Sequence, residues 1–218
     1  MEKHWYALKI FYNKVFEMEE HLRSRGVECF IPTVRVELKG EDFFKAKRRL
    51  STVDETRRGD NRYIVEDPKI FRRKTIVSSL IFVRMTGAEI KGLVSDFWEG
   101  KLPVSGFVYT RVNPKNGKRE AQVIPDRQMD IFMMVVNSGV AGLDFFSEEK
   151  IVNYTEGDRV RVLRGPLKGA EGYIKRIRKD RRLLVSVRGF IAVATCFIPF
   201  DDLEKIETEE EEPNISQQ

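Results

Sequence analysis

The residues that could carry out chemistry are few, and their spacing does not suit catalysis. The side chains that bear a thiol or an imidazole are those of His4, His21, Cys29 and Cys196. Structural zinc requires four nitrogen or sulfur ligands, usually in close pairs such as CxxC, and this sequence contains no such pair. It also lacks GxSxG, GxGxxG and the GxxxxGK loop, the motifs of nucleophilic catalysis and phosphate binding. We therefore expect no enzymatic activity, no metal and no cofactor.

Binding chemistry is better supported, because basic residues are in excess. The chain has 39 Lys and Arg against 34 Asp and Glu, and residues 207–212 hold five of the glutamates. Thirteen bases lie between Arg35 and Lys74, including the consecutive Lys47, Arg48 and Arg49. This distribution suits an anionic partner such as nucleic acid, and ordinary surface solubility is the alternative. We take the Lys47–Arg49 run as candidate nucleic-acid contacts.

Two apolar periodicities predict the elements that would position these residues. Alternation predicts strands at Trp5–Phe11, Cys29–Leu38, Ile76–Met85, Phe107–Val112 and Ala121–Ile124. Stripes at helical spacing predict helices between Asn13 and Gly26, over residues 90–97 and from Asp126 onward. Residues 39–74 interrupt this pattern with little periodicity, and so long a segment is unusual for a plain connection. We expect a functional or mobile insertion there.

The last third of the chain has a different pattern. Residues 137–156 are polar and aperiodic, which predicts a linker. Five short strands are then predicted at Arg159–Leu163, Gly172–Arg178, Leu183–Arg188, Ala192–Phe197 and Leu203–Ile206. Short strands at such close spacing predict a small β-barrel over 157–206, because closure removes exposed strand edges. The acidic end, residues 207–218, buries nothing and is expected to be disordered.

One segment of the predicted barrel has a recognisable pattern. In residues 157–172, GDRVRVLRGPLKGAEG, Val160 and Val162 alternate with arginines, so the valines should point inward. Glycines in the loop permit backbone conformations that other residues avoid. The spacing resembles the KOW motif, whose domains are small SH3-like barrels that dock proteins or RNA. Its loop residues are Gly165, Pro166, Gly169 and Gly172.

The N-terminal half carries a second resemblance. The segments that resemble the NusG N-terminal domain are Trp5-Tyr6-Ala7, residues 27–33, Leu80-Ile81-Phe82-Val83, residues 104–108 and residues 123–126. Together with the KOW motif, the resemblance spans residues 3–206 in the domain order of the NusG family of transcription elongation factors. It implies an α+β fold. An antiparallel sheet flanked by helices would occupy residues 1–136, and a small SH3-like KOW barrel would occupy 157–206.

This resemblance implies a non-enzymatic factor that rides on RNA polymerase and suppresses pausing or termination. Residues 144–147 and 123–129 are similar to the specialised RfaH-like and UpxY-like members, which serve particular operons, often for surface polysaccharide. The Ile76–Leu80 segment departs from the Phe-Pro-Gly-Tyr-type turn of the family, which leaves contact with the termination factor Rho open. The alternative is a ribosome-associated or RNA-binding KOW protein without a polymerase role.

The predicted polymerase-binding surface combines strand alternation with the resemblance. Leu80 and Phe82 share one face of a strand, and an apolar sheet face left open indicates a partner. In the family this sheet docks on the clamp helices of the largest polymerase subunit, and positions matching Leu80 and Phe82 contribute. Lys9 and Phe11 share a face of the first strand and are included. The alternative is that segment 39–74 covers this face.

A second predicted surface lies on the first helix. Lys14, His21 and Arg25 match positions where RfaH-like proteins touch the non-template DNA strand, whereas Glu17 stands where a base is expected. A solvated helix face is the alternative explanation. The resemblance also implies a second protein partner for the KOW barrel, either a ribosomal protein or Rho.

Three features indicate a soluble cytoplasmic protein with no membrane partner. Cys29 and Cys196 lie far apart and form no disulfide framework, which fits a reducing compartment. The start, MEKHWYALKI, lacks the layout of a signal peptide. The longest apolar stretches, such as Ile76–Val83, are too short to cross a bilayer.

Overall fold

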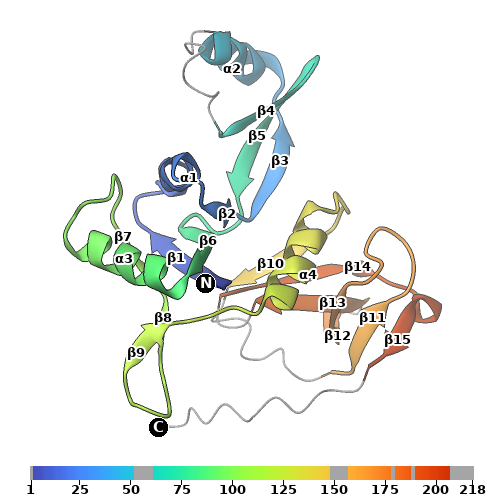
Figure 1. Ribbon diagram of the computed structural model, residues 1–218. Coiled ribbons are helices and arrows are strands. Elements are labelled where there is room, and N and C mark those ends of the chain that lie inside the picture. Colours follow the sequence, from blue (N-terminus) through green and yellow to red (C-terminus); the bar gives the residue numbers. More distant parts are fainter. Residues whose placement is uncertain (1, 52–60, 148–156, 178–179, 188–189, 207–218) are drawn as a thin grey trace. The chain divides into compact units, whose positions relative to one another are not determined.

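The computed structural model describes residues 2–51, 61–147, 157–177, 180–187 and 190–206 (Figure 1). The chain forms two compact units, Met1–Asp126 and Arg127–Gln218. The boundary between them falls at the start of the third predicted helix, earlier than the expected domain limit at residue 136. The expected domains, 1–136 and 157–206, stay predictions, as does the expectation that fragments 1–136 and 154–206 each fold alone. The acidic end at 207–218 lies outside the described residues.

The first unit is built on an antiparallel sheet of order β2-β6-β1-β7. Its strands are β1 (Lys3–Ile10), β2 (Glu28–Phe30), β6 (Leu80–Thr86) and β7 (Gly106–Val108). The strands expected at the start of the chain and at Ile76–Met85 are confirmed as β1 and β6. The extended stretch expected over Cys29–Leu38 is divided at Pro32, where β2 ends and another sheet begins.

Two helices contribute the apolar core on one face of this sheet. They are α1 (Val15–Ser24) and α3 (Gly87–Trp98), and both predicted helical stripes are confirmed. Thr86 and Glu89 form a reciprocal capping box at the start of α3. The core gathers alternate residues of β1 and β6 with the helical stripes, including Tyr6, Leu8, Ile10, Met18, Leu22, Ile81, Val83, Met85, Ile90 and Leu93.

The inserted segment forms a substructure of its own, which corrects the expectation of an aperiodic segment. A second antiparallel sheet of order β3-β5-β4 joins β3 (Thr33–Glu37), β5 (Lys69–Thr75) and β4 (Tyr63–Glu66). Helix α2 (Gly40–Ser51) packs Ala46 against Leu38 and Ile70. The helical stripe was hidden by the bases around it, and the strands carry charges on both faces. Residues 52–60 lie outside the described residues.

A short hairpin completes the first unit. It pairs β8 (Thr110–Val112) with β9 (Arg119–Ala121) around a turn in which Gly117 has a φ of 67°. The turn expected at Asn116-Gly117 is confirmed. The strand expected over Phe107–Val112 is divided between β7 and β8, which lie in different sheets, and the strand expected over Ala121–Ile124 shares only Ala121 with β9.

The second unit contains α4 (Asp126–Asn137) and an antiparallel six-stranded sheet of order β10-β14-β13-β12-β11-β15. Its strands are β10 (Asp144–Ser147), β11 (Arg159–Val162), β12 (Glu171–Ile177), β13 (Asp180–Val187), β14 (Ile191–Phe197) and β15 (Leu203–Lys205). The five predicted strands are present. Among the described strands, the edges β10 and β15 do not pair with each other, so the expected closed barrel is not found.

Strand β10 lies inside the expected linker, 137–156. It pairs with β14 along its whole length, and Phe146 packs against Leu184, Ala192 and Ala194. The Phe145-Phe146 pair therefore supplies a core contact in a stretch whose surrounding Gly, Ser and Asn predict a linker. Residues 148–156 lie outside the described residues. No helix among the described residues is long and apolar enough to span a membrane.

Candidate functional site

The four residues predicted to bind polymerase lie on one face of the central sheet. Lys9 of β1 lies opposite Leu80 of β6 on one side and opposite Phe107 of β7 on the other. In the next row, Ala7 lies opposite Phe82. Directly opposed residues of antiparallel strands point to the same face. Residues two apart on one strand, such as Ala7 and Lys9, also share a face, so the two rows lie next to each other on it. We call this surface the aromatic sheet face and define it as Lys9, Phe11, Leu80, Phe82 and Phe107.

Aromatic rings extend this face along β7. The ring centroid of Phe11 lies 6.0 Å from that of Phe107, which in turn lies 5.3 Å from that of Tyr109. Gly106 allows the backbone of β7 to lie close to that of β1, because a Cβ at this position would sit 2.3 Å from the Lys9 carbonyl oxygen. The role of Phe107 was not predicted, although its alternation with Val108 in β7 is the signal that would have found it.

The expectation that this face is open to solvent is wrong at its centre. Leu80 is 3% exposed and Phe82 is fully buried, whereas Phe11 and Phe107 at the rim are exposed and Lys9 is half-buried. Alternation shows that two residues share a face, but it does not show whether that face is covered. The aromatic sheet face therefore has a buried centre and an accessible aromatic rim.

The loop between β1 and α1 was not singled out by the sequence. Tyr12 and Asn13 have φ values of 59° and 56°, a region that residues other than glycine rarely occupy. Tyr12 is 82% exposed, and its ring centroid lies 6.3 Å from that of Phe11. An unfavourable backbone that presents an exposed aromatic beside the rim is typical of a binding surface.

The three nucleic-acid residues predicted on or beside α1, of which Lys14 and Arg25 flank the helix, carry less free charge than expected. Lys14 is paired with Glu17 at 3.4 Å, and Arg25 lies 3.9 Å from Asp96. Burial and the nearby Arg25 lower the pKa of His21, and among the described residues its buried Nε2 atom has no hydrogen-bond partner. His21 is therefore neutral at pH 7, so it contributes no cation to this surface.

Helix α2 carries the other predicted nucleic-acid residues. Lys47, Arg48 and Arg49 are all exposed, because Ala46 and Leu50 face the sheet beneath them. The exposed Phe44 lies on the same helix. The structure thus places the predicted bases on two helices, α1 and α2, rather than in one cluster.

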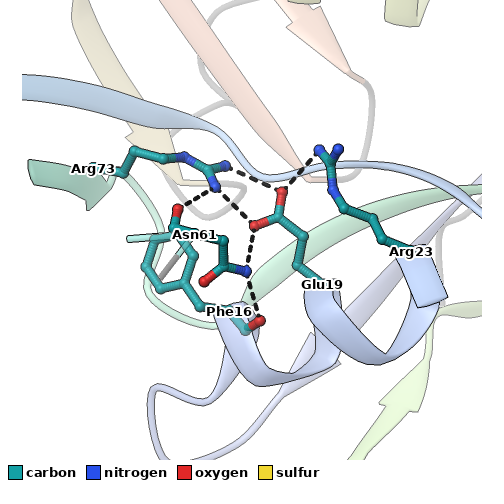
Figure 2. A network of polar contacts seen from close by, with 5 residues as sticks. All are labelled: Phe16, Glu19, Arg23, Asn61 and Arg73. Atoms are coloured by element: carbon teal, nitrogen blue, oxygen red, sulfur yellow. Dashed lines mark hydrogen bonds and ion pairs between the residues drawn. The ribbon is translucent and has the colours of Figure 1, made fainter. Parts of the chain in front are cut away.

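A buried carboxylate joins α1 to the insertion (Figure 2). Glu19 is fully buried and accepts hydrogen bonds from Arg73 at 2.8 Å, Arg23 at 3.0 Å and Asn61 at 3.1 Å. Asn61 also donates to the Phe16 carbonyl oxygen, and the Arg73 guanidinium lies 5.0 Å from the centre of the Phe16 ring. A buried charge needs such partners, so this network attaches the insertion to the helix.

Sequence reasoning missed this network, although a signal was present. Glu19 lies one position after Met18 and three before Leu22, so it falls inside the apolar stripe of α1. A charged residue within a buried stripe requires a partner of opposite charge. The sequence does not say which of the many bases that partner is.

The predicted KOW loop adopts a tight, hydrogen-bonded conformation. Gly165 and Gly169 have φ values of 80° and 88°, and the Gly169 amide donates to the Val162 carbonyl oxygen at 2.8 Å. Pro166 is exposed between them. A Cβ at Gly172 would lie 2.2 Å from the Leu184 carbonyl oxygen. The four loop residues therefore shape the backbone, and the inward direction predicted for Val160 and Val162 agrees with their burial.

A second buried carboxylate lies beside this loop. Glu171 accepts hydrogen bonds from Arg127 at 2.6 Å and Arg161 at 2.8 Å, and Arg159 lies within 3.5 Å. Burial alone would raise the pKa of Glu171, but the hydrogen bonds from Arg161 and Arg127 outweigh it and hold the pKa below its usual range. Because Arg127 belongs to α4, this contact attaches the helix to the sheet of the second unit.

Other reactive groups form no recognisable centre. Within the described ranges, no group of three or more His, Cys, Asp or Glu side chains could hold a metal ion. Cys29 is a buried free thiol, and burial raises its pKa to about 11, so it is protonated at neutral pH. The side chain of Cys196 lies outside the described residues.

The chain was compared with known proteins in three ways, and two of the comparisons found a match. A family model described as "NusG: Transcription termination factor nusG" matches residues 3–133, more than half of the chain. The search of curated proteins found no match. A solved structure described as "Domain interaction in Thermotoga maritima NusG" matches with 19% sequence identity and a TM-score of 0.38, over 95% of this chain and 99% of that chain.

Proposed function

The chain belongs to the NusG family, and we propose that it is a non-enzymatic elongation and antitermination factor that binds RNA polymerase through the aromatic sheet face. Factors of this family act in transcription and interact with RNA polymerase. The observation that carries the proposal is the placement of Lys9, Leu80, Phe82 and the rim aromatics on one face. Aromatic anchors of this kind dominate protein interfaces.

The clamp helices of the largest polymerase subunit are the proposed partner of this face. Because Leu80 and Phe82 are buried, their part of the surface must become accessible on binding. Phe11 and Phe107 are exposed and make the first contacts. Such a factor sustains elongation if it binds the active polymerase more tightly than the paused one, since a ligand shifts an equilibrium only through differential affinity.

The remaining surfaces have proposed partners too. Lys14 and Arg25 at the two ends of α1, with Lys47, Arg48 and Arg49 of α2, contact nucleic acid such as the non-template DNA strand, and neutral His21 contributes a hydrogen bond. The second unit recruits another protein, a ribosomal protein or Rho, through its KOW-like loop. The similarity of residues 144–147 to specialised members supports action at particular operons, such as those for surface polysaccharide.

The test exchanges rim aromatics for serine in the full chain. The double variant Phe11→Ser with Phe107→Ser removes two exposed rings, so it should keep the wild-type melting temperature. We expect polymerase binding in a pull-down to fall at least about thirtyfold, with a matching loss of terminator readthrough, because truncating even one anchor costs about 2 kcal/mol of binding free energy.

The matched control is Val112→Ser with Val123→Ser, which removes two exposed apolar side chains elsewhere in the first unit. This control should bind polymerase normally. Normal binding by the rim variant would overturn the assignment of this face. Retrieval of ribosomal RNA in place of polymerase by the wild-type chain would favour the ribosome-associated alternative.

A further inference from the structure

The basic side chains on the two faces of β5 differ in whether they pair with carboxylates. On one face, Lys69 lies 3.5 Å from Glu37, and Arg73 bonds the buried Glu19. The neighbouring strands add a further pair on that face, because Arg35 bonds Glu66 at 2.7 Å. The cations of this face are thus neutralised by carboxylates within the fold.

The opposite face presents Arg72 and Lys74 to solvent. Both side chains are exposed, and within the described part of the chain neither makes an ion pair or a side-chain hydrogen bond. They lie two residues apart on one strand, a spacing of about 7 Å. Two unneutralised cations at this spacing can reach neighbouring phosphates of one nucleic-acid strand.

Exposed valines complete the surface. Val34 lies opposite Lys74, and Val36 lies opposite Arg72. The two valines are 40% and 36% exposed, so they form an apolar surface beside the two cations. Figure 1 shows β3 and β5 side by side, with α2 near one end of the pair, where it contacts Leu38 and its neighbours. Arg72 and Lys74 lie beyond this contact, and among the described residues their side chains are exposed.

The chemistry of this face favours a double-stranded partner. Single strands are held by aromatic side chains on which bases stack, and valine has no ring. The aromatic side chain of the same row, Tyr63, packs against the core beneath α2. A duplex instead presents its stacked bases internally and its phosphates outside, so exposed cations without aromatic neighbours suffice to bind its backbone.

We propose that the face formed by Val34, Val36, Arg72 and Lys74 binds the phosphate backbone of duplex DNA without sequence specificity. This assignment adds a surface distinct from the bases of α1 and α2. It does not depend on polymerase binding, because the assay below contains no polymerase. If this face does not bind DNA, the proposal that the aromatic sheet face binds polymerase still stands. If the aromatic sheet face does not bind polymerase, the DNA-binding proposal still stands.

The experiment measures binding of the full chain to a fluorescent mixed-sequence DNA duplex by anisotropy over a series of salt concentrations. Arg72→Gln with Lys74→Gln should weaken binding about tenfold near physiological salt, and the log–log salt slope should become less steep by about 2, one for each lost phosphate contact. Thermal unfolding should be unchanged, because both side chains are exposed.

The matched control is Arg35→Gln with Lys69→Gln, which removes the same charge from the same sheet on its paired face. This control should keep nearly all of the wild-type slope. Equal weakening by both variants would show binding by net charge alone and overturn the proposal, as would no weakening by the first. Tighter binding of a single-stranded oligonucleotide or of duplex RNA, lost in the Arg72 and Lys74 variant, would overturn the choice of duplex DNA.

Discussion

In the central sheet of the first unit, β1 and β6 bury apolar side chains on both of their faces, from Trp5 to Leu8 and from Leu80 to Val83. In the sheet of the insertion, β3 and β5 expose valines on one face and carry ion pairs on the other. Both sheets are antiparallel, and the strands of the insertion lie in the chain between β2 and β6 of the central sheet. The difference shows that the central sheet is stabilised by burial of area, whereas the insertion depends on a small core and on its attachment to α1.

The largest expected effect is in the central sheet. Phe82→Ala removes a fully buried ring and leaves a cavity, so it should lower the free energy of unfolding by about 3–5 kcal/mol. Val36→Ala, at an exposed position of the insertion, should change it by less than about 0.5 kcal/mol. Chemical denaturation of the full chain measures both. A small effect of Phe82→Ala would mean that the centre of the aromatic sheet face tolerates loss of its packing.

The next effect concerns the attachment of the insertion to α1. Glu19→Gln keeps the shape of the buried side chain but leaves Arg73 without its counter-charge, and we expect a loss of about 2–4 kcal/mol. Proteolysis should then cleave residues 39–74 faster, while hydrogen exchange in β1 and β6 changes less. Equal loss of protection in both sheets would show that they unfold as one unit.

A third effect lies in the second unit and depends on pH. The folded pKa of Glu171 lies below its unfolded value near 4.3, so its stabilisation is complete above that value. It is lost as the pH falls through the folded pKa. Glu171→Gln should cost about 1–2 kcal/mol at pH 7 and should flatten the decline in stability below pH 5. An unchanged acid profile in the variant would assign that decline to other carboxylates.

The same unit offers a test of fragment boundaries. The fragment 154–206 lacks β10 and α4, and with them the bonds from Arg127 to Glu171 and from Arg182 to Asp144. We expect it to fold, as the strand pattern predicts, but with a lower melting temperature than 127–206. Equal melting temperatures would show that α4 and β10 add nothing to the sheet.

The smallest effect is at the surface of the insertion. The Arg35–Glu66 pair is more than half exposed on both sides, so water and salt screen it. Arg35→Gln should change stability by less than about 1 kcal/mol, and added salt should remove the difference. A larger, salt-independent loss would contradict the view that this sheet is held mainly through Glu19 and its small core.

The sequence by itself determined the local structure where one face is buried. Val15, Met18 and Leu22 recur at the helical period and form α1, and the alternating β6 segment forms a strand, because burial of one side imposes the period of the element. Glycines at turns were equally informative, since Gly117 and Gly165 occupy left-handed conformations that other residues disfavour.

The tertiary structure decided which surfaces are covered and which charges are paired. Leu80 and Phe82 share a face by alternation, but their burial depends on what lies over that face. Strand β5 carries the consecutive bases Arg72 and Arg73, yet Arg73 bonds Glu19 while Arg72 remains without an ionic partner among the described residues. A periodic pattern sets the direction of a side chain relative to its own backbone. Burial and pairing instead depend on residues that are distant in the sequence, as with Glu19 and Arg73, which are 54 positions apart.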